Sequence, residues 1–324
     1  MHSKRQIASM LVLTIALLLE NRGRAEPASR ILIESDLSSG TLAVLIDDHP
    51  IIGYRYGPSV DLPHLYPVHS PSGQLLTVQQ IEPYPHHRSM WFADAVKLDG
   101  GRRVSFYDAL YTRVNTNDPA SPFRDRIRHL SHTVKSIDAD QALVKMRLVW
   151  EMDLTTRVLD EARELRIVAL PDREYFLDLT FILTAGHGDV EFVSDWVHYA
   201  WPFIRMHPRF SVDQGGRITS STGAINQEQT NGKPALWIDY SNTVDGNTEG
   251  LAVFSYPQNP MPHKWLTRDY GTFGPRRTDD RSGVPFTLRR DESITQRVGI
   301  LVHRGNVESG RVAERFAQYV AGEL

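Results

Sequence analysis

The chain has 324 residues, a formal net charge of −3 at pH 7 and no cysteine. The absence of cysteine excludes disulfides, thiol catalysis and cysteine-ligated zinc. A mildly acidic chain without a basic tract is also a poor candidate for binding nucleic acid or anionic membranes. A chain of this length can be held together by its hydrophobic core alone.

The first 25 residues have the three regions of a secretory signal peptide. A short basic start is followed by an uncharged apolar run at 7–19 and by small residues up to Ala25. The alternative is a membrane anchor, but a spanning helix needs roughly 20 apolar residues. We therefore expect cleavage near Ala25, a periplasmic or extracellular location, and no stable insertion in a membrane. The mature chain, residues 26–324, then carries a net charge of −6.

Alternation of apolar and polar residues with a period of two dominates the mature chain. It is clearest at 141–152, 175–183 and 294–302, and it predicts half-buried strands. Further strands are expected at 30–36, 40–47, 51–56, 103–114, 126–137, 163–170, 189–196, 234–240, 249–256 and 263–268. Only the tail, at about 307–321, has the period of a helix. The sequence predicts one all-β domain at 26–324, a large antiparallel β-sandwich of ordinary or supersandwich form with a C-terminal helix.

Two histidines and an arginine, at 86–88, end a stretch that contains five prolines. Prolines at this density indicate an irregular loop, and loops on a rigid scaffold are where function concentrates. If a strand begins here, His86 and Arg88 point to one face and His87 to the other. The alternative is that all three are polar residues at the mouth of a strand, satisfied by backbone carbonyls.

A second polar group, Arg268, Asp269 and Tyr270, lies in the stretch WLTRDYG. On a strand, Arg268 and Tyr270 would share a face, and Asp269 would point the other way. An arginine suits the recognition of a carboxylate, and a tyrosine beside a cation can exchange protons if its pKa is lowered. The alternative is a surface Arg268–Asp269 pair next to a tyrosine at the edge of the core.

Aromatic residues gather around His198. They are Trp196, Tyr199, Trp201 and Phe203. Sugar rings present apolar faces, so aromatic side chains with a few polar groups make good carbohydrate sites. The alternative is that these aromatics simply fill the core of the sandwich.

The pairing of the two polar stretches resembles the secreted bacterial PmoA-like family of unknown function, some members of which are labelled methane oxygenase. The motifs are YPHHRSMWF (84–92), WLTRDYG (265–271) and ILVHRG (300–305). Tyr84 and Ser89 depart from the family pattern, which has Asp and Gly there. The resemblance implies that 86–88, Trp91 and 268–270 belong to one site. It implies no settled activity, and the chain lacks the apolar helices of a membrane-spanning oxygenase.

Three functions from different classes remain open, and the first is a secreted lyase or hydrolase acting on acidic or decorated glycans. The expected catalytic residues are His86, His87 and Tyr270, and the expected substrate-binding residues are Arg88, Arg268, Trp91, His198, Trp201 and Asp269. A lyase needs a neutralised carboxylate, a base and an acid, whereas a hydrolase more often uses two carboxylates. The residues therefore favour a lyase slightly.

The second open function is a metal protein. His86 or His87, His198, His263 and Asp269 could supply its ligands. The third is a non-catalytic sandwich that binds a glycan through the same aromatic side chains. In every case the expected partner is a glycan or another small polar molecule, and the sequence does not determine a cofactor or an oligomeric state.

Overall fold

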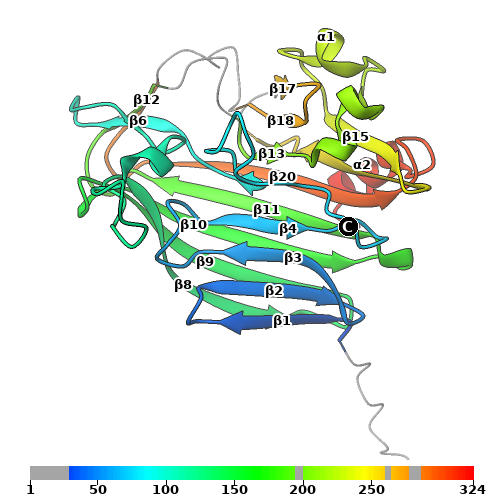
Figure 1. Ribbon diagram of the computed structural model, residues 1–324, viewed down its shortest axis with the longest axis horizontal. Helices are drawn as coiled ribbons and strands as arrows, with labels where there is room; N and C mark the ends of the chain where they lie inside the picture. The colour runs from blue at the N-terminus through cyan, green and yellow to red at the C-terminus, as the bar shows by residue number, and fades with distance from the viewer. Residues whose placement is uncertain (1–28, 194–199, 260–263, 277–285) are drawn as a thin grey trace, which may run out of the picture.

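The structure, a computed structural model, describes residues 29–193, 200–259, 264–276 and 286–324 (Figure 1). The signal peptide expected at 1–25 lies outside the described residues, as do Trp196, His198, Tyr199 and His263.

Two eight-stranded antiparallel sheets make up most of the protein (Figure 1). The first sheet runs in the order β1 (Ile31–Asp36), β2 (Thr41–Ile46), β3 (His49–Arg55), β4 (His64–Val68), β5 (Met90–Trp91), β13 (Phe203–Arg205), β18 (Thr272–Pro275) and β17 (Trp265–Thr267). The second sheet runs in the order β14 (Arg217–Ser220), β15 (Trp237–Val244), β16 (Asn247–Ser255), β20 (Ser293–Arg304), β11 (Tyr175–Thr184), β10 (Thr156–Ala169), β9 (Gln141–Met152) and β8 (Arg126–Ser136).

A smaller sheet and several short helices complete the described fold. The third sheet has the order β19 (Phe286–Leu288), β12 (Val190–Phe192), β6 (Ala95–Leu98) and β7 (Val104–Ser105). The helices are α1 (Asn226–Thr230), α2 (Val312–Ala321) and the 3-10 turns η1 (Ala109–Thr112), η2 (Pro171–Arg173), η3 (Pro208–Phe210) and η4 (Val212–Gln214). No helix within the described ranges is long and apolar enough to cross a membrane.

The period-two alternation explains why the sheets pack as they do. In β9 the apolar residues Ala142, Val144, Met146 and Leu148 are all buried, whereas the alternate residues Lys145 and Arg147 are exposed. One face of each strand therefore enters a common core, which confirms the predicted all-β antiparallel fold.

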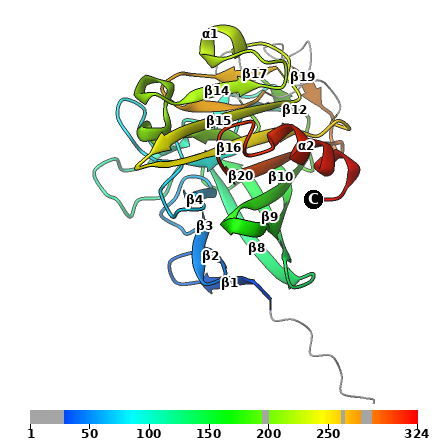
Figure 2. The same cartoon turned by 90° about the vertical axis from the view of Figure 1, so that its right-hand side faces the viewer.

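The C-terminal helix α2 is also confirmed, although it begins at Val312 rather than near residue 307. It lies against the second sheet beside β20 and β16 (Figure 2). Tyr319 of α2 packs on Phe176 of β11, with ring centroids 5.2 Å apart, and on Phe254 of β16. These residues form a second, smaller apolar cluster, so the helix covers a sheet face that would otherwise be exposed.

Three local expectations are wrong, and all three concern the candidate site. Residues 103–114 do not form one strand: β7 ends at Ser105 and η1 follows. Residues 86–88 lie in a turn and loop before the short strand β5, and 268–271 form the turn between β17 and β18. The alternation of faces expected for 86–88 and for 268–270 therefore does not apply, because it requires extended strands.

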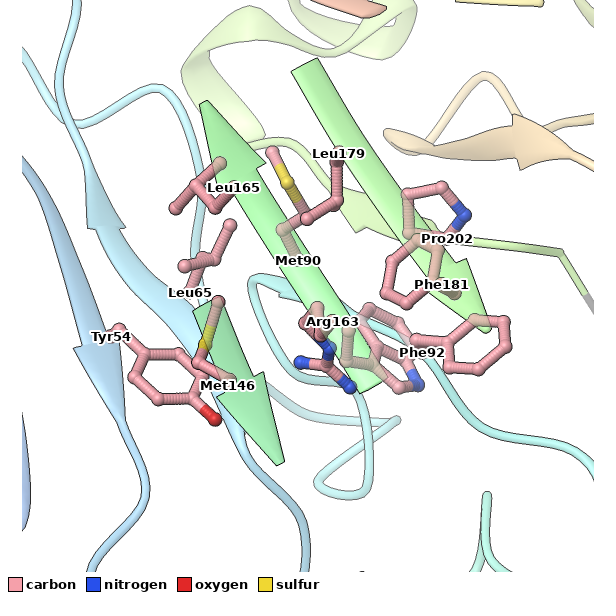
Figure 3. A pocket seen from close by; sticks show the side chains of 11 residues that line it. Tyr54, Leu65, Met90, Phe92, Met146, Arg163, Leu165, Leu179, Phe181 and Pro202 are labelled. Carbon is pink, nitrogen blue, oxygen red and sulfur yellow. The ribbon is translucent and has the colours of Figure 1, made fainter. Parts of the chain in front are cut away.

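A small cavity lies in the core. It is lined by Tyr54, Leu65, Met90, Trp91, Phe92, Met146, Arg163, Leu165, Leu179, Phe181 and Pro202 (Figure 3). Its volume of about 10 Å³ leaves room for about one water molecule, so it is not a substrate site. Arg163 is buried here beside Glu161, with Nη2 of the arginine 2.7 Å from Oε1 of the carboxylate.

Candidate functional site

The two polar stretches lie on either side of β13, which runs between β5 and β18 in the first sheet. Both stretches come directly before a strand that is antiparallel to β13, so both reach the end of β13 at Arg205. The amide of Arg205 donates to the carbonyl of Ser89 at 2.7 Å, and the amide of Met206 donates to the carbonyl of Gly271 at 2.8 Å. The sheet thus brings together two segments that are far apart in sequence.

The ring of Tyr84 joins the two stretches. It stacks on His87, with centroids 4.8 Å apart and an interplanar angle of 15°, and on Tyr270, with values of 5.3 Å and 25°. We call His86, His87, Tyr84, Tyr107, Tyr270 and Arg205 the Tyr84 cluster. His87 and Tyr270, both expected at one site, are separated in it by a single aromatic ring.

His87 is buried and neutral at pH 7. Its side chain is 3% exposed, and Nε2 lies 2.8 Å from Oη of Tyr107. Burial, together with smaller effects of the nearby His86, Arg205 and Arg88, lowers the pKa of His87 to about 3. Nδ1 has no hydrogen-bond partner among the described residues. In the tautomer in which Nε2 donates to Tyr107, Nδ1 keeps a free lone pair that can accept a proton.

Arg205 is a buried cation without a carboxylate partner. It is 4% exposed, Nη1 donates to the carbonyl of Tyr270, and Cζ lies 4.6 Å from the centroid of the Tyr270 ring. Nε has no partner, and no carboxylate of the described residues lies within ion-pair distance. Burial accordingly lowers the pKa of Arg205. Because an unpaired buried charge is costly, an anionic ligand is the natural complement of this side chain.

Arg88 has a different environment. It is equally buried, but its guanidinium forms an ion pair with the buried carboxylate of Asp61 and donates to the carbonyl of Pro85 at 3.2 Å. The expectation that Arg88 holds a substrate carboxylate is corrected, because Asp61 already occupies that position. Arg88 fixes the loop that carries His87.

Arg268 and Asp269 are directed away from the Tyr84 cluster. Nη1 of Arg268 donates to Oδ1 of Asn231 at 2.8 Å, and Oδ1 of Asp269 accepts from the amide of Gln227 at 2.8 Å. Both side chains therefore fasten the α1 segment to the turn before β18. Their expected role in binding substrate is corrected on this ground, and Tyr270 is the member of the turn that enters the site.

Tyr270 stays protonated at neutral pH. Burial raises the pKa of its hydroxyl, and this effect outweighs the opposite effect of the nearby Arg268 and Arg205. The expectation that a neighbouring cation lowers the pKa of Tyr270 is therefore wrong. The hydroxyl is suited to donating a proton rather than to accepting one.

His86 and Tyr111 form the rim of the Tyr84 cluster. Nδ1 of His86 lies 3.0 Å from Oη of Tyr111, and the ring of His86 meets that of His87 edge-on at 4.7 Å. His86 is half-buried, whereas Tyr111 is 55% exposed. His86 thus lies between the exposed Tyr111 and the buried His87.

The two tryptophans expected to bind sugar are core residues. Trp91 stacks on Phe203 with centroids 4.8 Å apart, and Nε1 of Trp201 donates to Oδ2 of Asp94 at 3.0 Å. Both rings are almost fully buried, so neither presents a face to a ligand, and their assignment to substrate binding is corrected. The alternative interpretation, that these aromatics fill the core, applies to both. His198 lies outside the described residues.

Sequence reasoning missed Arg205, Tyr107 and the linking role of Tyr84. Tyr84 lies in the motif YPHHRSMWF, where the sequence shows it only as a departure from the family pattern. Tyr107 lies in a segment interpreted as a strand. Arg205 carries no local signal, because its lack of a carboxylate partner depends on strands that are distant in sequence. For the metal alternative, no group of three or more His, Cys, Asp or Glu side chains in the described ranges could hold an ion.

Several solved structures are weakly similar to this chain. The GH36 alpha-galactosidase AgaB from Geobacillus stearothermophilus is 6% identical with a TM-score of 0.49, and the match covers 86% of this chain but 42% of that enzyme. A putative aldose 1-epimerase from Escherichia coli K12 is 11% identical with a TM-score of 0.33, over 85% of this chain and 99% of that one. A polysaccharide lyase is 10% identical with a TM-score of 0.31, over 89% and 34%. At these values the likenesses transfer no activity to this chain.

No curated protein matches the sequence. A family match does exist, to a family of unknown function (DUF6807), and it extends over residues 41–317. The match includes both polar stretches and most of the two large sheets, and it carries no methane-oxygenase label. The chain therefore belongs to this family of unknown function.

Proposed function

We propose that the protein is a secreted lyase that cleaves glycans carrying carboxylate groups, with the Tyr84 cluster as its active site. The observation that carries the proposal is the unpaired cation of Arg205 beside the unpartnered Nδ1 of His87. A uronate carboxylate would complete the ion pair that Arg205 lacks. The same carboxylate acidifies the adjacent C–H group that a base must deprotonate.

The reaction would be a β-elimination. His87 takes the proton from the carbon that bears the carboxylate, and the electrons of that C–H bond form a carbon–carbon double bond. The bond from the neighbouring carbon to the glycosidic oxygen breaks, and Tyr270 gives the leaving oxygen its proton. The charge that develops on the carboxylate in the transition state is stabilised by Arg205.

The pKa values of the free protein suit these roles in part. Tyr270 is protonated and can act as the acid. His87 is neutral and has a lone pair, although a pKa of about 3 makes it a weak base in the absence of ligand. A bound carboxylate offsets the repulsion from Arg205, so substrate binding raises the pKa of His87 and strengthens the base.

Binding of the glycan also requires a movement at Tyr84. The ring of Tyr84 lies against His87 and is itself half-buried, whereas Glu82 and Pro83 beside it are exposed. The short turn at 81–84 can carry the ring away without breaking a strand of either large sheet. The site proposed here is therefore closed in the free protein and opens when the glycan binds.

The site fits a lyase better than a hydrolase because the nearby carboxylates are bonded to other groups of the protein. A hydrolase commonly needs two carboxylates that face the scissile bond. Asp61 is held by Arg88, and Asp269 is bonded to the α1 segment, so neither is available.

The test is turnover on a panel of uronate polysaccharides, followed by the ultraviolet absorbance of the unsaturated sugar product. The proposal expects product from at least one polymer with the wild-type protein and none with His87→Ala or Arg205→Met. Binding without product would instead identify a non-catalytic glycan-binding protein. If both variants gave as much product as the wild-type protein, the assignment of the site would be contradicted.

A further inference from the structure

A second histidine pair lies on β8, outside the Tyr84 cluster. His129 and His132 are three residues apart, a spacing that places side chains on opposite faces of a regular strand. A β-bulge interrupts the pairing of β8 with β9 between His129 and Ser131. The bulge inserts Leu130 as an extra residue, so the two histidines point the same way. Nε2 of His129 lies 3.1 Å from Nδ1 of His132.

Two tyrosines of the first sheet and the segment after it enclose this histidine pair. Oη of Tyr54, on β3, lies 3.1 Å from Nδ1 of His129, the ring nitrogen that does not face His132. The ring of Tyr56 packs against both histidines, with centroids 4.3 Å from His129 and 5.5 Å from His132. Tyr54 is buried and also lines the small core cavity (Figure 3). The pair is thus held in place at the seam between the edge of the second sheet and the first sheet.

We infer that His129 and His132 form a two-histidine binding site for a divalent transition-metal ion of the copper and zinc class. Imidazole nitrogens bind zinc at roughly 2.0–2.1 Å, so two ligands at angles between 90° and the tetrahedral angle lie about 2.8–3.4 Å apart. The observed separation of 3.1 Å between the two nitrogens falls in this interval. Imidazole is a ligand that suits both copper and zinc.

The contact with Tyr54 has the form of an outer-shell interaction at a metal site. A metal-bound histidine almost always donates its other ring N–H to a neighbouring oxygen, which fixes the tautomer and the orientation of the ring. When Nδ1 of His129 donates to Oη of Tyr54, the lone pair of Nε2 is directed toward His132.

One nearby group opposes the binding of a cation. The positive charge of Arg163 acts on His129 through space. Its guanidinium is paired with Glu161, however, so much of that charge is compensated. Within the described residues no third histidine or carboxylate joins the pair. Because both histidines are half-buried, the remaining coordination positions are open to water or to a donor atom of a ligand.

The test is calorimetric titration of the purified, untagged protein with Zn²⁺ and separately with Cu²⁺. We expect one saturable site per chain, with tighter binding of Cu²⁺ as the general order of affinities requires. His129→Ala and His132→Ala should each abolish the site. Tyr54→Phe, which removes only the outer-shell oxygen, should weaken binding by about 10–100-fold. His49→Ala, an exposed histidine on β3, is the matched control and should bind as the wild type does.

Two results would overturn the inference. One is the absence of saturable binding of either ion to the wild-type protein. The other is unchanged binding by both His129→Ala and His132→Ala. The melting temperature of each variant without metal shows whether it folds, and His132→Asn replaces the more exposed partner if an alanine variant does not. The outcome is independent of the proposed lyase activity, since none of these residues belongs to the Tyr84 cluster.

Discussion

Two arginines near His87 are equally buried and have opposite electrostatic environments. Arg88 is 3% exposed and forms an ion pair with Asp61, whereas Arg205 is 4% exposed and has no carboxylate partner among the described residues. The first arrangement is complete within the protein. The second lacks an opposite charge among the described residues, and we propose that an anionic ligand supplies it. The comparison shows that two arginines of the same burial can differ in whether the protein supplies the opposite charge, and this difference is the basis for assigning them different roles.

The largest effect on stability is expected when the ion pair between Arg88 and Asp61 is broken. Arg88→Leu leaves the carboxylate of Asp61 buried and unpaired, and loss of one partner of a buried ion pair costs about 3–5 kcal/mol. Denaturant unfolding of the variant measures the loss. The double variant Arg88→Leu/Asp61→Leu should recover part of it, since neither charge then remains. A single variant as stable as the wild type would show that the two arginines do not differ in the way described.

Arg205→Met should cost less stability than Arg88→Leu and should weaken the binding of ligand. No ion pair is lost, but the hydrogen bond to the carbonyl of Tyr270 is, so the free energy of unfolding should fall by about 1–3 kcal/mol, less than in Arg88→Leu. Affinity for a carboxylated glycan should also fall, because hydrogen bonds to charged groups contribute about 1.5–3 kcal/mol, or roughly a tenfold to hundredfold change in Kd. Denaturant unfolding and ligand titration of the same preparation measure both quantities. A large loss of stability with unchanged affinity would place Arg205 among the structural residues with Arg88.

A smaller effect is expected at the hydroxyl that orients His87. Tyr107→Phe removes the oxygen that lies 2.8 Å from Nε2, at a cost of about 1 kcal/mol in stability. Because the tautomer of His87 is then no longer fixed, kcat should fall while KM stays nearly constant. Tyr111→Phe, which removes the hydroxyl at the exposed rim, is the matched control and should affect both parameters less. Equal effects of the two variants would argue against a positioning role for Tyr107.

The smallest effect on stability at neutral pH is expected from the protonation of His87. Its pKa is lowered to about 3 in the folded protein, so the unfolded chain binds more protons between this value and the ordinary pKa near 6.5. The contribution of His87 to stability is therefore present above about pH 6.5 and is lost as the pH falls toward 3. His87→Gln should lower the slope of stability against pH in this window by up to about one proton. Tyr270→Phe should leave the slope unchanged, and a slope unaffected by His87→Gln would contradict the lowered pKa.

The pKa of His303 is shifted in the opposite direction from that of His87. His303 is fully buried, but Nε2 lies 2.7 Å from Oδ1 of Asp239, and this partner raises the pKa of His303 despite the opposing effect of burial. Its contribution to stability is present below the ordinary pKa and is lost as the pH rises through the raised value. A histidine of the Tyr84 cluster and a structural histidine thus differ in the same respect as the two arginines, namely in whether the protein supplies the opposite charge.

The sequence alone could predict most of the strands and the C-terminal helix. Period-two alternation and turn residues are local signals, and β9, β11 and β20 follow them almost residue by residue. The meeting of 86–88 with Tyr270 could be predicted only through the resemblance to a family. The turn at 268–271 does carry a local signal, since Asp269 and Gly271 are turn residues and Gly271 has a φ of 108°.

Other features depend on contacts that no local pattern records. The bulge at Leu130 in β8 reverses the expected direction of His132, and its cause is the pairing with β9. The burial of Trp201 against Asp94 and the pairing of Arg88 with Asp61 also join segments that are distant in sequence. An aromatic residue or an arginine has the same appearance in the sequence whether it binds a ligand or fills the core.

The central claim is that Arg205 receives the carboxylate of a glycan, and a matched pair of ligands tests it most directly. A uronate oligosaccharide and the same oligosaccharide with its carboxylates reduced to alcohols are titrated into the wild-type protein and into Arg205→Met. The account predicts that the wild type binds the carboxylated form more tightly, by roughly tenfold to a hundredfold, and that Arg205→Met loses this preference. Equal affinity of the wild type for both forms, or a preference that survives in Arg205→Met, would contradict it.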